Sequence, residues 1–142
     1  MFYERKGHVM ILVHGPANPS EQEWGVYVQD FASAQLGQDP VRCVLVVTLG
    51  GAPNAKQRSA VLAISPTIEV RTSVCTDNVI ARGVLTAMSW INKYPMYAYK
   101  RDDLDSAMEK LNVPPDWRAD VKSIVWRKEA LLTTREPKRA SR

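Results

Sequence analysis

Two short runs of apolar residues leave few choices for the fold of this chain. Residues 8–14 (HVMILVH) and residues 43–49 (CVLVVTL) are rich in aliphatic side chains and hardly alternate with polar residues. Both runs are far shorter than a membrane-spanning helix, and a strand that is apolar on both sides must be covered on both sides. The sequence therefore predicts an α/β protein in which both runs are central strands of a mainly parallel sheet.

Three further segments predict the outer strands of this sheet. Residues 2–5 precede the first apolar run across Lys6-Gly7, which is typical of a β-hairpin and adds one antiparallel strand. Residues 68–75 alternate apolar and polar side chains, which indicates a strand nearer an edge with one polar side. Residues 96–99 follow Pro95 and predict a short edge strand. With the helices, the expected order is β-β-α-β-α-β-α-β-α-α with about five strands.

Capping patterns mark the starts of two helices between these strands. Ser20 stands three residues before Glu23, and Asn54 stands three residues before Gln57, as in a capping box. The helix that begins after Ser20 is expected to end near Gly37, and the one after Asn54 near Ile64. The first of these helices is expected to bury a stripe at helical spacing: Trp24, Tyr27, Val28 and Phe31.

A third helix is predicted after the alternating strand, with Thr76 or Asp77 as its cap. Gly83 is expected to let this helix approach the sheet closely, while Trp90 falls off the apolar stripe and is expected to be exposed. The stripe predicted to face the sheet is Ile80, Val84, Ala87, Met88 and Ile91. A fourth helix opens at Asp102-Asp103 with these residues inward: Leu104, Ala107, Met108 and Leu111.

The net charge of +4 is unevenly distributed along the chain. Residues 1–117 hold 11 Lys/Arg and 12 Asp/Glu, a net charge of −1, whereas residues 118–142 hold 8 and 3, a net charge of +5. The α/β body is therefore almost neutral, which argues against a nucleic-acid partner bound through a basic face of the domain.

The basic C-terminal part is predicted to form its own unit of structure. We expect an α/β domain over residues 1–113, an amphipathic helix over 114–132 that starts at Pro114-Pro115, and a disordered basic tail over 133–142. The helix either packs on its own domain or docks on a partner chain or an anionic membrane surface. Its candidate interaction residues are Trp117, Val121, Ile124, Val125, Trp126 and Arg127.

Metal and thiol chemistry find little support in the sequence. Cys43 and Cys75 are expected to be free, buried thiols in a reducing cytoplasm, because the chain begins without a signal-peptide pattern. The chain has no CxxC motif and only two histidines, His8 and His14, so we predict neither a zinc site nor any other cofactor.

A ligand site, if the domain has one, is expected at the carboxyl ends of the parallel strands. The Gly50-Gly51 turn opens a helix there, but the segment lacks the glycine-rich nucleotide motifs. No serine or cysteine stands in a nucleophile-elbow pattern, so no catalytic triad is predicted. The candidate residues of this rim are His14, Gly50, Gly51, Asn54, Arg58, Thr76, Asp77 and Arg82.

The order of elements resembles the SpoIIAA-like, or STAS, fold. Three segments also resemble a bacterial group described as STAS/SEC14-like: residues 2–15, residues 45–58 with the turn Gly50-Gly51-Ala52-Pro53, and residues 76–83 (TDNVIARG). The resemblance covers about residues 2–112. It implies a non-enzymatic, cytoplasmic module that binds a protein partner, including a second copy of itself.

One feature of that family is missing from this chain. Anti-anti-sigma members of the STAS family carry a phosphorylatable serine at the start of the helix after the third strand, in an Asp-Ser-Ser-Gly-like context. The matching residues here are 51–55 (GAPNA), and Ser59 lies a turn or more further along. We therefore expect no serine-phosphorylation switch at that position.

Overall fold

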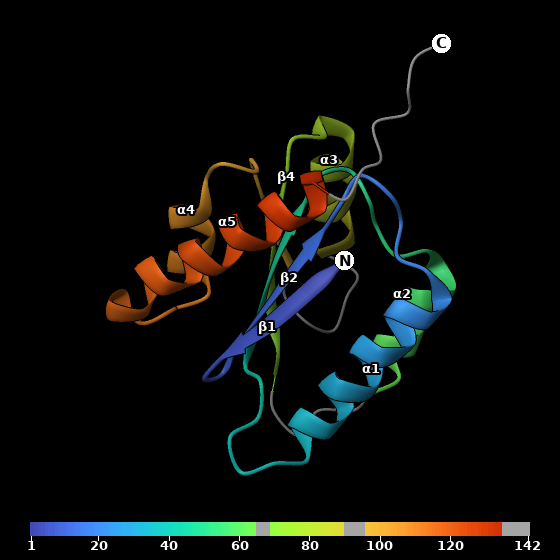
Figure 1. Cartoon of the computed structure of the whole chain (residues 1–142), viewed down its shortest axis with the longest axis vertical. Coiled ribbons are helices and arrows are strands. Elements are labelled where there is room, and N and C mark those ends of the chain that lie inside the picture. The colour runs from blue at the N-terminus through green and yellow to red at the C-terminus, as the bar shows by residue number, and fades with distance from the viewer. Residues whose placement is uncertain (65–68, 90–95, 135–142) are drawn as a thin grey trace.

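The computed structural model of this chain describes residues 1–64, 69–89 and 96–134. Its elements follow the order predicted from the sequence (Figure 1). The strands are β1 (Phe2–Lys6), β2 (Val9–His14), β3 (Cys43–Thr48), β4 (Arg71–Thr76) and β5 (Met96–Tyr99). The helices are α1 (Glu21–Gln35), α2 (Ala55–Leu62), α3 (Val79–Ser89), α4 (Leu104–Lys110), the 3₁₀ turn η1 (Pro115–Trp117) and α5 (Arg118–Thr134).

The five strands form one mixed sheet in the order β1-β2-β3-β4-β5. β1 and β2 form the predicted antiparallel hairpin, turning at Gly7, whose φ is +55°. All other neighbouring strands are parallel, with Ile11 beside Leu45 and Leu45 beside Ser73. The prediction of a mainly parallel α/β sheet is thus confirmed, and β5 is an edge strand as expected.

The two central strands are covered on both sides because successive side chains point to opposite faces. Every residue of β2 is buried. Ile11 and Leu45 belong to a core cluster on the face covered by α4 and α5, whereas Met10 and Leu12 join a second cluster under α1. Figure 1 shows α1 and α2 on one side of the sheet and α4 and α5 on the other.

Both capping boxes predicted from the sequence are present. The Ser20 hydroxyl accepts from the Glu23 amide at 3.1 Å, and the Asn54 carboxamide oxygen accepts from the Gln57 amide at 2.8 Å. Three residues of the predicted α1 stripe (Trp24, Tyr27 and Phe31) are buried and Val28 is half-buried. The Trp24 indole donates to the Gln57 carbonyl at 2.8 Å. This bond ties α1 to α2 over the sheet.

The C-terminal helix packs on its own domain. Val121, Ile124 and Val125 are buried against β2 and α4, in the same core cluster as the predicted inward residues of α4. Ion pairs around the rim of α5 join it to the body: Lys6–Asp120 at 2.9 Å, Lys122–Asp105 at 2.6 Å and Lys128–Glu4 at 3.2 Å. α5 extends to Thr134, past the predicted end at residue 132.

The sequence prediction for α3 is wrong about which side faces the sheet. Ile80, Val84 and Ala87 are exposed, and a Cβ built on Gly83 would meet nothing within 4 Å, so this glycine allows no close approach to the sheet. The inward side instead carries Arg82, whose guanidinium donates to the Thr76 carbonyl at 2.8 Å. Arg82 stands opposite the apolar stripe on the helix, so the stripe faces solvent where Arg82 faces the sheet.

One smaller expectation also needs correction. Asn78 caps α3 by accepting from the Ala81 amide at 3.1 Å, in place of Thr76 or Asp77.

The alternating strand β4 lies next to the edge strand β5, as expected. On its polar side Arg71 is exposed, whereas Ser73 is fully buried and its hydroxyl donates to the Ala107 carbonyl at 3.1 Å.

Some predictions fall outside the described residues. They concern Trp90, Ile91, the side chain of Met88, the start of the alternating strand at Ile68, and the tail from residue 135 onward. Within the described part of the chain, no helix has both the length and the apolar composition needed to cross a membrane.

Candidate functional site

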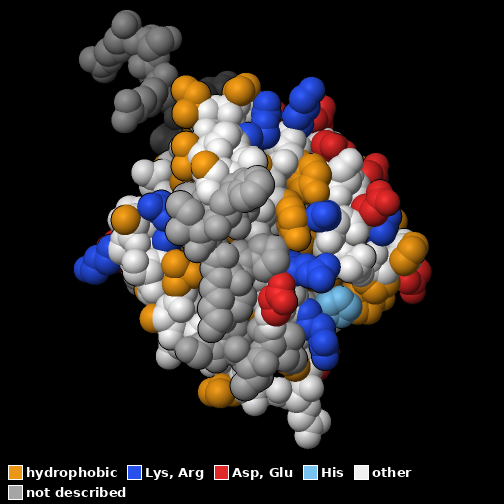
Figure 2. Space-filling model, turned by 180° about the vertical axis from the view of Figure 1, so that it is seen from behind, with side chains coloured by type: hydrophobic (Ala, Val, Ile, Leu, Met, Phe, Trp, Pro, Cys, Tyr) orange, Lys and Arg blue, Asp and Glu red, His pale blue; other side chains and the backbone are white. Residues whose placement is uncertain are grey.

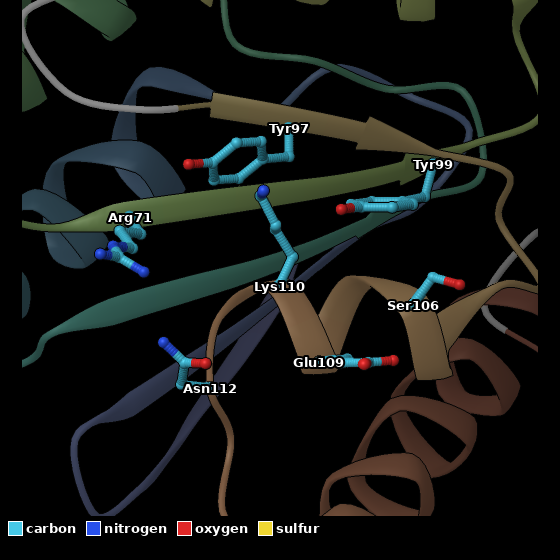
Figure 3. Close-up of a pocket in the computed structure, with 7 residues that line it drawn as sticks. All are labelled: Arg71, Tyr97, Tyr99, Ser106, Glu109, Lys110 and Asn112. Carbon is cyan, nitrogen blue, oxygen red and sulfur yellow. The ribbon is translucent and has the colours of Figure 1, made fainter.

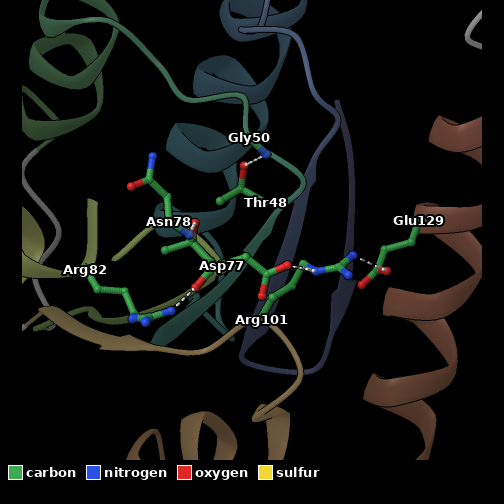
Figure 4. Close-up of polar contacts among 8 residues, drawn as sticks. Thr48, Gly50, Asp77, Asn78, Arg82, Arg101 and Glu129 are labelled. Carbon is green, nitrogen blue, oxygen red and sulfur yellow. Dashed lines mark hydrogen bonds and ion pairs between the residues drawn. The ribbon is translucent and has the colours of Figure 1, made fainter. Parts of the chain in front are cut away.

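The carboxyl ends of β2, β3 and β4 meet at one edge of the sheet, where the sequence predicts a ligand site. The predicted residues do gather near this edge, but most of their polar groups bond within the chain. Figure 4 shows the part of this rim that runs from β3 across β4 to α5.

The Gly50-Gly51 turn is closed by hydrogen bonds to one backbone oxygen and two side-chain oxygens, and it is not open to an anion. The Gly51 amide donates to the Gly15 carbonyl at 2.8 Å, and the Gly50 amide donates to the Thr48 hydroxyl at 3.0 Å. The next amide, of Ala52, donates to the Asn18 side chain at 3.0 Å. All three donors that an anion would need are therefore occupied by the strand end and the loop after β2.

Replacing Gly51 by alanine is expected to destabilise the fold, because the added Cβ would lie 2.0 Å from the Ala17 carbonyl oxygen. This oxygen belongs to the backbone, so it cannot move away without moving the loop. We therefore expect a loss of about 1–3 kcal/mol in the free energy of unfolding. Gly25→Ala is the matched control. It adds a Cβ in open space within α1 and should stabilise the chain by roughly 0.5–1 kcal/mol. Equal midpoints of urea unfolding for both variants would contradict the prediction.

The polar residues of α2 are used for its own structure. Asn54 caps the helix, and the Arg58 guanidinium donates to the Pro53 carbonyl at 2.9 Å. Gln57 is buried, closes the capping box and also donates to the Pro19 carbonyl at 3.1 Å. The sequence indicated its capping role but not this contact, which joins segments 38 residues apart.

Asp77 pairs with a residue that the sequence analysis did not single out. Its carboxylate lies 2.9 Å from Arg101, which in turn lies 3.5 Å from Glu129 of α5 (Figure 4). Among the described residues, the charged partner of Asp77 is therefore Arg101 and not the rim candidate Arg58. Burial raises the pKa of Glu129, and the nearby Arg101 opposes that shift. Exposed ion pairs of this kind contribute at most about 1 kcal/mol, so the chain of contacts fits a structural link between β5 and α5.

His14 lies inside the protein and not on the rim surface. Its side chain is 2% exposed, its ring stacks on Trp24 at 6.2 Å between centroids, and its Nδ1 has no hydrogen-bond partner among the described residues. Burial, together with the N-terminal ammonium, lowers the pKa of His14 from 6.5 to about 4, while Glu23 opposes the shift. The imidazole is therefore neutral at pH 7 and out of reach of a substrate.

The two cysteines are free and buried, as predicted. Burial raises the pKa of Cys43 to about 11 and that of Cys75 to about 12, so neither thiol is a ready nucleophile at neutral pH. Cys75 packs in the core cluster under α4 and α5, whereas His14 stacks on α1 across the sheet. Asp77, paired with Arg101, is exposed. The three groups do not converge on one cleft.

The candidate interaction residues of the C-terminal segment divide between core and surface. Val121, Ile124 and Val125 are buried, so no partner can use them while α5 stays in place. Trp117 packs on His8, with 5.1 Å between ring centroids. Trp126 is exposed, and its neighbour Arg127 lies 3.9 Å from Glu4 (one ion pair).

The most unusual surface feature of the described chain is the outward side of α3. Val79, Ile80 and Val84 are 69%, 78% and 52% exposed, and Gly83 and Ala87 lie beside them. Seen from behind, hydrophobic side chains gather near the top of the molecule, over the position of α3 in Figure 1 (Figure 2). We refer to Val79, Ile80, Gly83, Val84 and Ala87 as the α3 apolar face.

The described residues contain no group of three or more potential metal ligands. A comparison with protein-family models, curated proteins and solved structures finds no match to this chain. Two surfaces remain as candidate sites. The α3 apolar face is exposed, whereas most polar groups of the predicted rim are bonded within the chain.

Proposed function

We propose that this protein is a non-enzymatic interaction module and that the α3 apolar face binds a second copy of the chain. The single observation that carries the proposal is the exposure of Val79, Ile80 and Val84 on one side of a helix. Exposed apolar side chains that gather on one face are typical of protein contact surfaces, whereas scattered ones are ordinary.

The charge of this face favours a second copy over a charged partner. α3 contains one charged residue, Arg82, and its guanidinium is directed to the Thr76 carbonyl on the inward side. Two such uncharged faces can meet about a twofold axis without repulsion between like charges. Gly83 in the middle of the face lets a second helix approach closely, since no Cβ stands between the two backbones.

The size of the face sets the expected strength of the dimer. α3 has 11 residues and is therefore about 16 Å long. One side of a helix of that length covers less than the roughly 800 Å² per partner that a standard stable interface buries. We therefore expect a reversible dimer that dissociates in the micromolar range.

Sedimentation velocity over a concentration series tests this prediction. Ile80→Glu and Val84→Glu should each weaken the dimer by roughly 100-fold, because each would place an unpaired carboxylate in an apolar contact. Both side chains are exposed in the single chain, so the thermal stability of the monomer should hardly change.

Leu36→Glu is the matched control, because Leu36 is 90% exposed and follows α1, away from α3. It introduces the same charge at another exposed apolar position and should leave the dimer intact. A wild-type chain that remains monomeric at high micromolar concentration would show the proposal to be wrong. So would a dimer that all three substitutions weaken equally.

We further propose that the α/β fold is of the STAS type, with α5 as an addition to it. The element order and the antiparallel hairpin at the start of a parallel sheet support this proposal. The buried His14 and the raised pKa values of both thiols support a non-enzymatic role.

A further inference from the structure

An open groove with a largely polar lining lies on the opposite side of β5 from the α3 apolar face. It lies between α4 and the last two strands and has a volume of about 580 Å³, within the usual range for ligand pockets. Figure 3 shows its lining residues: Arg71, Tyr97, Tyr99, Ser106, Glu109, Lys110 and Asn112.

The groove is rich in hydrogen-bond donors that have no partner among the described residues. Within the part of the chain that the structure describes, the Arg71 guanidinium and the Tyr97 and Tyr99 hydroxyls make no hydrogen bond or ion pair. Arg71 and Lys110 give the lining two positive charges against one negative charge from Glu109. By contrast, Lys122, Arg127 and Lys128 of α5 are paired with carboxylates of Asp105 and Glu4.

Lys110 places its positive charge beside the aromatic rings of the groove. Its side chain rises from α4 between Tyr97 and Tyr99 (Figure 3), and its Nζ lies 4.7 Å from the centre of the Tyr97 ring. A cation–π contact holds the ammonium in place and leaves its N–H groups available to an incoming acceptor. Arg71 lies at one end of the groove, on the same side as Asn112.

We propose that this groove binds a small ligand that carries an anionic group attached to a flat ring. Lys110 and Arg71 bind the anionic group, a phosphate or a carboxylate, and the tyrosine side chains contact the ring. The proposal is independent of the dimer, because none of the lining residues belongs to the α3 apolar face.

An NMR titration of the ¹⁵N-labelled full chain tests the proposal with three probes: phenyl phosphate, benzoate and inorganic phosphate. At least one of the two aromatic anions should shift the amide signals of Tyr97, Tyr99 and Lys110 at millimolar concentration. Lys110→Met and Arg71→Gln should each weaken binding about tenfold, since each removes a charge-assisted hydrogen bond. Lys56→Met, which removes an exposed cation on α2, should leave binding unchanged.

The three probes distinguish the role of the anionic group from the role of the ring. The stronger of phenyl phosphate and benzoate identifies the anionic group. Inorganic phosphate that binds as tightly as phenyl phosphate would contradict the role of the ring. Absence of shifts at the groove with both aromatic anions, or an equal loss of binding in Lys56→Met, would overturn the site.

Discussion

Val125→Asp is expected to lower the thermal unfolding midpoint of the protein more than any other substitution proposed for this chain. Val125 has no exposed surface and packs in the core cluster between α5 and the sheet. A carboxyl group there would lose its water without gaining a partner, which we expect to cost about 4–5 kcal/mol of the free energy of unfolding. Since whole domains are typically stable by about 5–15 kcal/mol, this is a large share of the total.

Trp126→Asp separates this packing role from a docking role of α5. Trp126 is the next residue along the helix but is 59% exposed, so its replacement should change the stability by less than about 0.5 kcal/mol. Thermal unfolding followed by circular dichroism measures both variants. If Val125→Asp has the same thermal unfolding midpoint as the wild type, α5 does not pack on the sheet as described. That result would favour a helix that is free to dock on a partner.

The second large effect is a loss of stability on mild acidification, caused by His14. Its pKa is about 4 in the folded chain and about 6.5 when exposed, so the unfolded chain binds the proton more readily. Above pH 6.5 both states hold a neutral imidazole and stability is unaffected. As the pH falls from 6.5 to about 4, the folded state should lose up to about 3 kcal/mol relative to the unfolded state.

Urea unfolding at a series of pH values checks this expectation with two variants. His14→Gln cannot titrate, so most of the decline between pH 6.5 and 4.5 should vanish in this variant. His8→Gln removes the other histidine and should retain the decline. Glu23, whose pKa is lowered by its hydrogen bond to the N-terminal ammonium, adds its own loss only below its ordinary pKa of 4.5. A decline that is the same in all three proteins would refute the assignment to His14.

Local signals in the sequence predict most of the fold correctly. The capping boxes at Ser20 and Asn54 form as expected because both partners lie three residues apart and need no tertiary context. The doubly apolar β2 and β3 lie in the middle of the sheet because no polar side is left to face water. The hairpin at Gly7 is likewise set by neighbouring residues.

The errors arise where the pattern within one segment does not determine the outcome. The apolar stripe of α3 is real, but periodicity shows only that one side is apolar and not what it faces. In the structure that side faces solvent, and Arg82 on the opposite side donates to the Thr76 carbonyl. Arg101 pairs with Asp77, which lies 24 residues earlier in the chain. The groove is lined by residues of both β5 and α4. Neither arrangement has a signature within one segment of sequence.

The position of α5 has a consequence for how the chain is made. β2 is synthesised early, yet the face of β2 that α5 covers stays open until the ribosome has added the last helix; Lys6 and its partner Asp120 are 114 residues apart. At ordinary rates of translation this delay is on the order of ten seconds. During that time an apolar central strand is exposed to other nascent chains. We therefore expect stalled or shortened products to aggregate, and this protein to depend on chaperones that shield its first strands until α5 arrives.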